Sequence, residues 1–337
     1  MIKVFEAFAG IGTQRMALRN LGIEHEVVAI AEIDKFAIKS YEAIHGEVNN
    51  LGDISKIKTE DIPDHDLFTY SFPCQDISIA GKQAGITENT RSGLLWECEK
   101  VIEVKRPKYL LMENVKNLVG KKFKADFDKW LERLEELGYS NYWQVLNAKH
   151  YGIPQNRERV FCVSILGEHT PYEFPKPIPL ELRLKDVLED EVDEKFYLSK
   201  EQVEKIKFSE KNLNNNEIKQ IGQYDTPTRK NSSRYRVYDN KGLSPSLTTM
   251  GGGGREPHVL EEKTAISVVD HFRIRKLTPK ECWRLMGCTD EDFYKAQKVN
   301  SNTQLYKQAG NAIVVDVLEA IFNKLFIDTE STGNNGR

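Results

Sequence analysis

Short apolar runs alternate with amphipathic stretches through the first half of the chain. Six runs read as buried strands of a parallel sheet, at 4–8, 27–31, 67–71, 109–112, 143–148 and 160–166. Between the fourth and fifth runs, apolar residues recur at helical spacing from Phe123 to Leu137, and Gly138 follows where a helix commonly ends. This alternation predicts an α/β fold with a mostly parallel sheet.

The pattern changes after Leu166. Prolines at 171, 175, 177 and 179 interrupt the chain, and a charged stretch over 185–211 leads into an asparagine-rich run at 212–216. We therefore predict a catalytic and cofactor-binding domain at 1–170 and a smaller, loop-rich domain at 171–272. A return segment at 273–327 follows, in which Thr278 and Glu281 have the spacing of a capping box. We expect Asn311 to cap an apolar helix over 312–326 that packs on the first domain, and a disordered tail at 328–337.

Composition narrows the class of protein. The five cysteines form no Cys-x-x-Cys pair, and no apolar stretch has the length of a membrane span. We expect a cytoplasmic protein without a structural metal. The net charge of −3 gives no overall sign of a nucleic-acid partner, but segment 223–257 holds six basic and three acidic residues with three tyrosines. Such a segment is either a solvated surface or a nucleic-acid contact.

Reactive side chains lie next to the predicted strands, at the edge where open α/β sheets bind ligands. The candidates are Cys74 after the third strand, Glu113 after the fourth, and Arg157 and Arg159 before the sixth. A lone cysteine is more often a core residue than a nucleophile. A thiol beside a carboxylate and a guanidinium group, however, suits attack on a polar heteroaromatic ring. The structural alternative for both arginines is an ion pair with Glu158 or Glu113.

A glycine loop follows the first strand. Gly10 and Gly12 allow a close backbone approach to a cofactor, and Glu32, at the end of the second strand, can accept hydrogen bonds from ribose hydroxyls. The third glycine of the dinucleotide fingerprint is absent, because Arg15 stands in its place. The loop therefore favours a ribose-containing cofactor without a pyrophosphate. Asp53 is either a further acceptor, suited to an adenine amino group, or a turn residue.

Taken in their order along the chain, these motifs resemble those of the cytosine-5 DNA methyltransferase family, which uses S-adenosyl-L-methionine. The resemblance rests on the Phe-x-Gly-x-Gly loop at 8–12, Glu32, Asp53, Pro-Cys-Gln at 73–75, Glu-Asn-Val at 113–115, Gln-x-Arg-x-Arg at 155–159, the segment 275–287 and Gln-Ala-Gly-Asn at 308–311. It implies a Rossmann-like, S-adenosylmethionine-dependent methyltransferase fold with a target-recognition domain in the variable middle region. Ile313 and Ala312 depart slightly from the family pattern, in which valine and serine are usual.

The resemblance also implies roles for individual residues. The cofactor pocket would consist of Phe8, Gly10, Ile11, Gly12, Glu32, Ile33, Asp53, Ile54, Pro73, Leu94, Asn311 and Ile313. Contacts to DNA would come from Gln75, Ser78, Arg234, Arg236, Thr248 and Arg255.

By the same resemblance, the Cys74 thiolate adds to C6 of a cytosine flipped out of double-stranded DNA, and C5 then takes the methyl group, leaving S-adenosyl-L-homocysteine. Glu113 would bond N3 and the 4-amino group, and Arg159 would bind O2. Arg157 would lie near the phosphate or brace the loop.

Three alternatives remain at this point. A related branch of the family methylates transfer RNA, and the catalytic residues alone do not exclude RNA as the substrate. A nicotinamide-dependent oxidoreductase could share the sheet, although the missing glycine argues against it. A silent DNA-binding module would not need Cys74, Glu113 and both arginines. We expect a monomer that belongs to a restriction–modification system. Whether a cognate restriction endonuclease acts independently beside it is left open.

Overall fold

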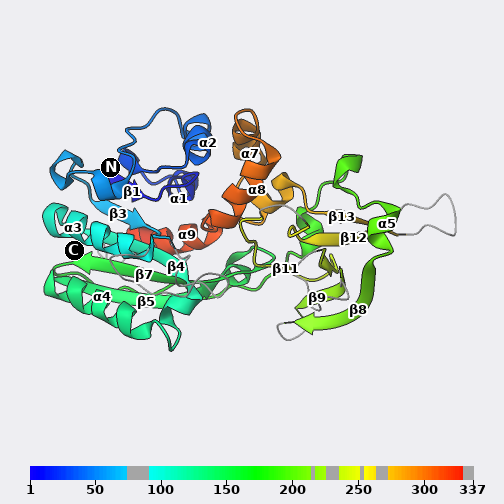
Figure 1. The fold of residues 1–337 in the computed structure, drawn as a ribbon. Coiled ribbons are helices and arrows are strands. Elements are labelled where there is room, and N and C mark those ends of the chain that lie inside the picture. The colour runs from blue at the N-terminus through cyan, green and yellow to red at the C-terminus, as the bar shows by residue number, and fades with distance from the viewer. Residues whose placement is uncertain (74–90, 214–216, 225–234, 251–253, 263–271, 329–337) are drawn as a thin grey trace. The chain divides into compact units, whose positions relative to one another are not determined.

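The computed structural model describes residues 1–73, 91–213, 217–224, 235–250, 254–262 and 272–328 (Figure 1). The chain folds into two compact units. The first comprises Met1–Asn147, Glu158–Pro177 and Val315–Arg337, and the second comprises Ala148–Arg157 and Ile178–Val314.

A six-stranded sheet with the order β2-β1-β3-β4-β7-β5 forms the centre of the first unit. Its strands are β1 (Ile2–Ala7), β2 (His25–Ala31), β3 (Leu67–Tyr70), β4 (Tyr109–Val115), β5 (Tyr139–Asn147) and β7 (Glu158–Leu166). The pairs β1–β2, β1–β3 and β3–β4 are parallel, whereas β7 runs antiparallel to both β4 and β5. All six predicted strands are confirmed, with ends shifted by a few residues, and the sheet is mixed because β7 is reversed.

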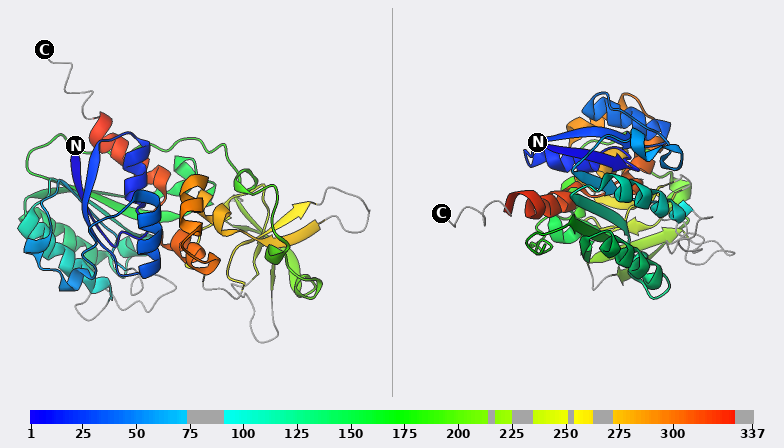
Figure 2. Two further views of the ribbon diagram at one scale, coloured as in Figure 1. Left: turned by 90° about the horizontal axis from the view of Figure 1, so that it is seen from above. Right: turned by 90° about the vertical axis from the view of Figure 1, so that its left-hand side faces the viewer.

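Helices cover both faces of this sheet (Figure 2). They are α1 (Thr13–Asn20), α2 (Lys35–His45), α3 (Leu95–Lys105), α4 (Lys124–Glu136) and α9 (Val315–Phe322). The main core lies under α3 and α4, where Trp130, Phe127 and Val101 pack on strand side chains such as Phe5 and Phe68. The helix predicted over 123–137 is α4, and Gly138 follows it with φ of 86° as predicted.

The second unit holds a five-stranded sheet with the order β13-β12-β10-β9-β8 and a two-stranded pair, β11-β6 (Figure 1). Its strands are β6 (Gln155–Asn156), β8 (Ile206–Leu213), β9 (Ile218–Tyr224), β10 (Val237–Tyr238), β11 (Ser244–Pro245), β12 (His258–Glu262) and β13 (Phe272–Lys276). Its helices are α5 (Lys200–Val203), α6 (Pro279–Arg284), α7 (Asp290–Gln297) and α8 (Asn302–Asn311). The predicted capping box is confirmed at the start of α6, where the Thr278 side chain accepts from Glu281 N.

The C-terminal segment differs from the sequence expectation in two ways. Asn311 is the last residue of α8 and does not cap a helix over 312–326; the next helix, α9, begins at Val315 and packs against α1. Residues 273–314 group with the second unit, and we had expected them to form one return segment with α9. Helices α6 and α8 stay together in the second unit because Trp283 of α6 is fully buried and its indole N–H donates to the carbonyl of Leu305 in α8.

Candidate active site

The glycine loop after β1 has the backbone geometry of a ligand-binding turn. Phe8, Gly10 and Gly12 all have positive φ, at 56°, 59° and 75°. At Gly12 the space is closed as well, because a Cβ there would lie 2.6 Å from the side chains of Tyr41 and His45. Only glycine fits this position, so the loop presents its backbone rather than a side chain.

The Glu32 carboxylate fixes this loop to the end of β2. Its Oε2 accepts from Gly10 N at 2.8 Å, and its Oε1 accepts from the backbone amides of Ile33 and Asp34 at 2.8 and 2.7 Å. A carboxylate offers about four acceptor positions, of which three are used here. The remaining capacity suits a ribose hydroxyl.

Asn50 is a positioning residue that the sequence did not indicate. Its amide donates to Glu32 O at 3.0 Å, while its Oδ1 accepts from the backbone amides of Glu32 and Gly52 at 3.2 and 3.0 Å. The side chain therefore joins the end of β2 to the segment that holds Asp53 and Ile54. An asparagine before a glycine turn was the only signal available.

Beyond Asn50, the residues predicted around the adenine differ in exposure. Ile33 is 73% exposed and Ile54 is 5% exposed. Asp53 accepts from Ser55 N and Oγ, and these hydrogen bonds, with the Lys56 ammonium at 3.3 Å, lower the pKa of its carboxyl. Leu94 is half-buried against the main core.

The segment after β3 lies beside the end of β4. The two strands pair in parallel, with Tyr70 opposite Met112. Just beyond, Asn114 Nδ2 donates to Phe72 O at 3.1 Å and holds the backbone that leads to Pro73. Cys74 lies outside the described residues, as do Gln75, Ser78 and Arg234. Phe72 is thus held to Asn114, the residue that follows Glu113.

Glu113 and Arg159 form a pair on adjacent strands. Glu113 is 9% exposed, and Arg159 Nε lies 3.2 Å from its Oε1. Arg159 also donates to its neighbour Glu158 O at 2.8 Å, whereas the Glu158 carboxylate binds Lys116. Of the ion pairs considered from the sequence, the one between Arg159 and Glu113 is present. It fixes a carboxylate and a forked cation side by side.

The four described cysteines are all buried. Burial raises the pKa of the Cys162 thiol to about 12, and it also raises the pKa values of Cys98 and Cys282. A thiol held in its neutral form is a poor nucleophile.

In the second unit, Arg157 braces a loop. It is 3% exposed, and its guanidinium donates to the carbonyls of Leu247, Gly310 and Ala312 at 2.9, 3.0 and 2.9 Å. Gln155 adds to this junction, because its Oε1 accepts from Leu247 N at 2.9 Å. Between the phosphate role and the bracing role, these contacts favour bracing.

The same junction holds Thr248 and the chain before Asn311. A Cβ at Gly310 would lie 2.1 Å from Thr248 O, so the helix and the loop touch through backbone. The Thr248 residue is exposed, as are Arg255 and Asn311, while Arg236 is half-buried and Ile313 is buried. Asn311 and Ile313 belong to the second unit, unlike the other predicted cofactor residues.

The first unit's fold and this arrangement of side chains define a class, the α/β proteins that bind a ribose-containing cofactor with a glycine loop and an acidic residue after the second strand. The sequence matches the family described as C-5 cytosine-specific DNA methylase over residues 2–327. The chain belongs to this family and is a cytosine-5 DNA methyltransferase.

Relatives span nearly the whole chain. Type II methyltransferase M2.ScrFI of Lactococcus lactis subsp. cremoris is 41% identical over 97% of this chain and 99% of its own length. Orphan methyltransferase M.SPBetaI of Bacillus phage SPbeta is 33% identical over 98% of this chain and 99% of its own length. The Schizosaccharomyces pombe Dnmt2 methyltransferase structure is 19% identical, covers 96% of this chain and 97% of its own, and has a TM-score of 0.72, which supports the fold alone.

Proposed function

We propose that this protein transfers a methyl group from S-adenosyl-L-methionine to C5 of a flipped-out cytosine, within a specific sequence of double-stranded DNA. The supporting observation is the pair formed by Glu113 and Arg159 beside the chain that leads to Cys74. Relatives described as type II and orphan methyltransferases support a modification role for this chain too, either with a cognate restriction endonuclease or without one.

The cofactor residues of the first unit fit S-adenosylmethionine. The loop backbone around Gly10 and Gly12 would bind its methionine and ribose part, Glu32 would accept from the ribose, and Asp53 from the adenine amino group. The bound cofactor supplies an electrophilic methyl group. We place Asn311 and Ile313 at the same cofactor by resemblance to the family.

Cys74 is the proposed nucleophile. Its thiolate adds to C6, which breaks the aromaticity and makes C5 an enamine-like carbon. Among the described cysteines, burial disfavours the thiolate at Cys98, Cys162 and Cys282, which supports this assignment. Once C5 has taken the methyl group, a base accepts the C5 proton, and the C6–S bond to Cys74 breaks, which restores the aromatic ring.

Glu113 and Arg159 hold the base during this addition. Glu113 would bond N3 and the 4-amino group, so that a proton at N3 offsets the charge that develops on the ring. Arg159 would bind O2 while it keeps the Glu113 carboxylate oriented. Arg157 would act from a distance, by positioning the segment that holds Thr248.

The DNA substrate and the position of the methyl group can be tested directly. Purified protein should transfer label from methyl-labelled S-adenosylmethionine to duplex DNA, and digestion should give 5-methylcytosine. Preferential labelling of transfer RNA would contradict the proposal. Bisulfite sequencing of DNA from cells that express the chain should then give the recognised sequence.

A further inference from the structure

Two peptide units of the glycine loop are held by neighbouring elements. The first is the unit that ends in the Gly10 amide, which donates to Glu32 Oε2 at 2.8 Å. The second joins Ile11 to Gly12, and its carbonyl oxygen lies 3.1 Å from His45 Nε2. A peptide unit is planar, so a hydrogen bond to one of its groups limits the rotation of the whole unit. Glu32 follows β2 and His45 ends α2, so two separate elements hold the loop.

The peptide unit between these two keeps both of its polar groups available. The Gly10 carbonyl and the Ile11 amide have no hydrogen-bond partner within the part of the chain that the structure describes. A backbone carbonyl accepts hydrogen bonds and a backbone amide donates one. Either group suits the amino-acid end of S-adenosylmethionine, whose ammonium donates hydrogen bonds and whose carboxylate accepts them.

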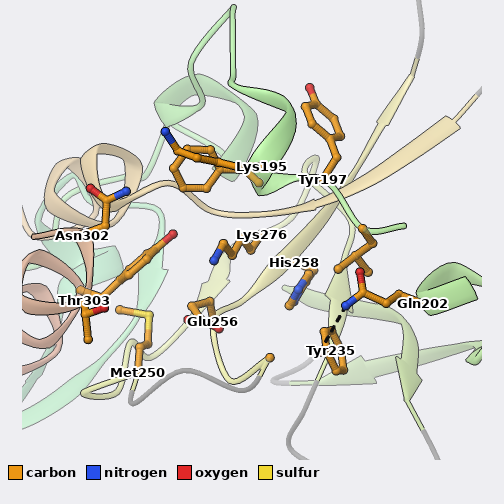
Figure 3. Close-up of a pocket in the computed structure, with 14 residues that line it drawn as sticks. Lys195, Tyr197, Gln202, Tyr235, Met250, Glu256, His258, Lys276, Asn302 and Thr303 are labelled. Atoms are coloured by element: carbon orange, nitrogen blue, oxygen red, sulfur yellow. Dashed lines mark hydrogen bonds between the residues drawn. The ribbon is translucent and has the colours of Figure 1, made fainter. Parts of the chain in front are cut away.

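The pocket in the second unit differs in this respect (Figure 3). Gln202 lines this pocket and donates to Tyr235 Oη at 3.5 Å, as the dashed line shows. Tyr306, on another wall, donates to the carbonyl of Leu277 at 2.5 Å. These polar side chains bond within the protein, whereas the Gly10–Ile11 peptide leaves its groups to a ligand.

Neighbouring side chains hold the His45 ring against the loop. A Cβ at Gly12 would lie 2.6 Å from His45 Nε2, so the ring is close to the loop backbone. The ring also lies against that of Tyr41, with centroids 4.7 Å apart. Tyr41 is itself fixed, because its hydroxyl donates to the buried carboxyl group of Glu6 at 2.8 Å. Tyr41, one helical turn before His45, therefore links α2 to the strand that precedes the loop.

The Ile11 carbonyl determines which nitrogen of His45 carries a hydrogen. A carbonyl oxygen only accepts, so His45 Nε2 must be the donor in this contact. The neutral ring with its hydrogen on Nε2 and the imidazolium both meet this requirement. The contact thus requires an N–H group at this position rather than a charge, and a glutamine side chain can also supply one.

We propose that His45 is a positioning residue for S-adenosylmethionine: its hydrogen bond to the Ile11 carbonyl fixes the loop so that the Gly10–Ile11 peptide faces the amino-acid end of the cofactor. This inference rests on the proposed function, because it takes the glycine loop as the cofactor site. His45 acts through the loop backbone and takes no part in the reaction at the cytosine. Loss of its N–H group should therefore weaken cofactor binding and leave the steps on DNA unchanged.

Variants with and without a donor test this role. In the full-length protein, His45→Gln keeps an N–H group near the position of Nε2, whereas His45→Met has a similar length and helix propensity but no donor. In calorimetric titrations with S-adenosyl-L-homocysteine, His45→Met should raise the Kd about tenfold, as expected for one lost hydrogen bond. His45→Gln should stay within about twofold of wild type. Glu42→Gln, at an exposed position of the same helix, is the matched control.

Kinetics separate positioning from a structural role. With duplex DNA, His45→Met should raise the KM for S-adenosylmethionine about tenfold, while kcat and the KM for DNA stay near those of Glu42→Gln. Inhibition of methylation by 5′-methylthioadenosine, which lacks the amino-acid end, should change by less than about twofold. His45→Leu, a second variant without a donor, should behave like His45→Met. Both should melt within a few degrees of His45→Gln in the absence of cofactor.

The possible failures have different meanings. If His45→Met binds S-adenosyl-L-homocysteine as tightly as wild type, or if His45→Gln is weakened as much as His45→Met, the donor has no positioning role. Equal weakening of 5′-methylthioadenosine, or a large fall in melting temperature in both donor-free variants, would show a general structural role and contradict the proposal. If wild type binds no S-adenosyl-L-homocysteine and methylates no DNA, the proposed function itself is wrong.

Discussion

At the scale of single residues, the sequence indicated candidate side chains but not the residues that support them. Glu32 and Glu113 lie where the strand pattern predicted, near the carboxyl ends of parallel strands, which share one edge of the sheet. Arg159 lies at the start of β7 and reaches the same edge only because β7 runs antiparallel to β4, a reversal that the strand pattern did not predict. Asn50 and the bracing role of Arg157 were not predictable, since each depends on contacts with residues distant in the chain. Such contacts arise from tertiary packing and leave no local pattern.

Glu113 gives the first prediction at this scale. Glu113→Gln keeps the shape of the side chain but removes the charge that faces Arg159 and would favour a proton on the base. Turnover on DNA should fall by about 100-fold or more, whereas the melting temperature should change little. Glu158→Gln is the control, because the Glu158 carboxylate pairs with Lys116 at a half-exposed site. Equal loss of turnover in both variants would contradict the role of Glu113.

Glu6 carries a buried carboxyl group and belongs to none of the sequence motifs. It is fully buried in β1 and accepts from Tyr41 Oη at 2.8 Å, and burial raises its pKa from 4.5 to about 7. The folded protein therefore holds this proton more tightly than the unfolded chain. Its contribution to stability is complete below pH 4.5 and is lost as the pH rises through 7.

Glu6→Gln should accordingly change the pH dependence of stability. The amide can still accept from Tyr41 but does not ionise. Between pH 5 and 8 the free energy of unfolding of the wild type should decline by about 2–3 kcal/mol more than that of the variant. Denaturant unfolding across this range measures the difference, with the exposed Glu42→Gln as control. Parallel pH profiles for wild type and Glu6→Gln would show that Glu6 does not titrate this way.

At the scale of elements, helices and strands were predictable where local signals agreed, and were missed where packing decided. The capping box at Thr278 and the glycine after α4 both placed helix ends correctly. The sequence suggested a helix start at Asn311, but Asn311 is the last residue of α8, and Gly310 before it approaches the backbone of Thr248 closely. That contact could not be inferred from the residues next to Asn311.

The close approach of Gly310 to Thr248 predicts the sign of the stability change when Gly310 is replaced by alanine. Gly→Ala in a helix ordinarily stabilises by about 1 kcal/mol. Gly310→Ala should instead destabilise the protein by about 1–3 kcal/mol, because the new Cβ would lie 2.1 Å from Thr248 O. Thermal unfolding measures the change. A variant as stable as the wild type would mean that the loop at Thr248 moves away without cost.

At the scale of the whole molecule, the change in composition near residue 170 predicted a second, loop-rich domain, whereas the second unit has a five-stranded sheet of its own. The chain nevertheless enters the second unit earlier, through Ala148–Arg157, and leaves it only at Val314. Short segments such as 148–157 carry too few residues to show a compositional change. Their membership is decided by partners, as when Gln155 bonds to Leu247 and Leu285.

The proposed reaction depends on a transient bond between the Cys74 sulfur and a cytosine ring. Duplex DNA with 5-fluorocytosine at the target tests it most directly, because fluorine cannot leave as a proton does and the adduct cannot resolve. In the presence of S-adenosylmethionine, we expect a covalent protein–DNA complex that survives denaturation, with the modified peptide containing Cys74. Cys74→Ala should form none. A complex that persists in this variant, or that maps to another cysteine, would contradict the mechanism.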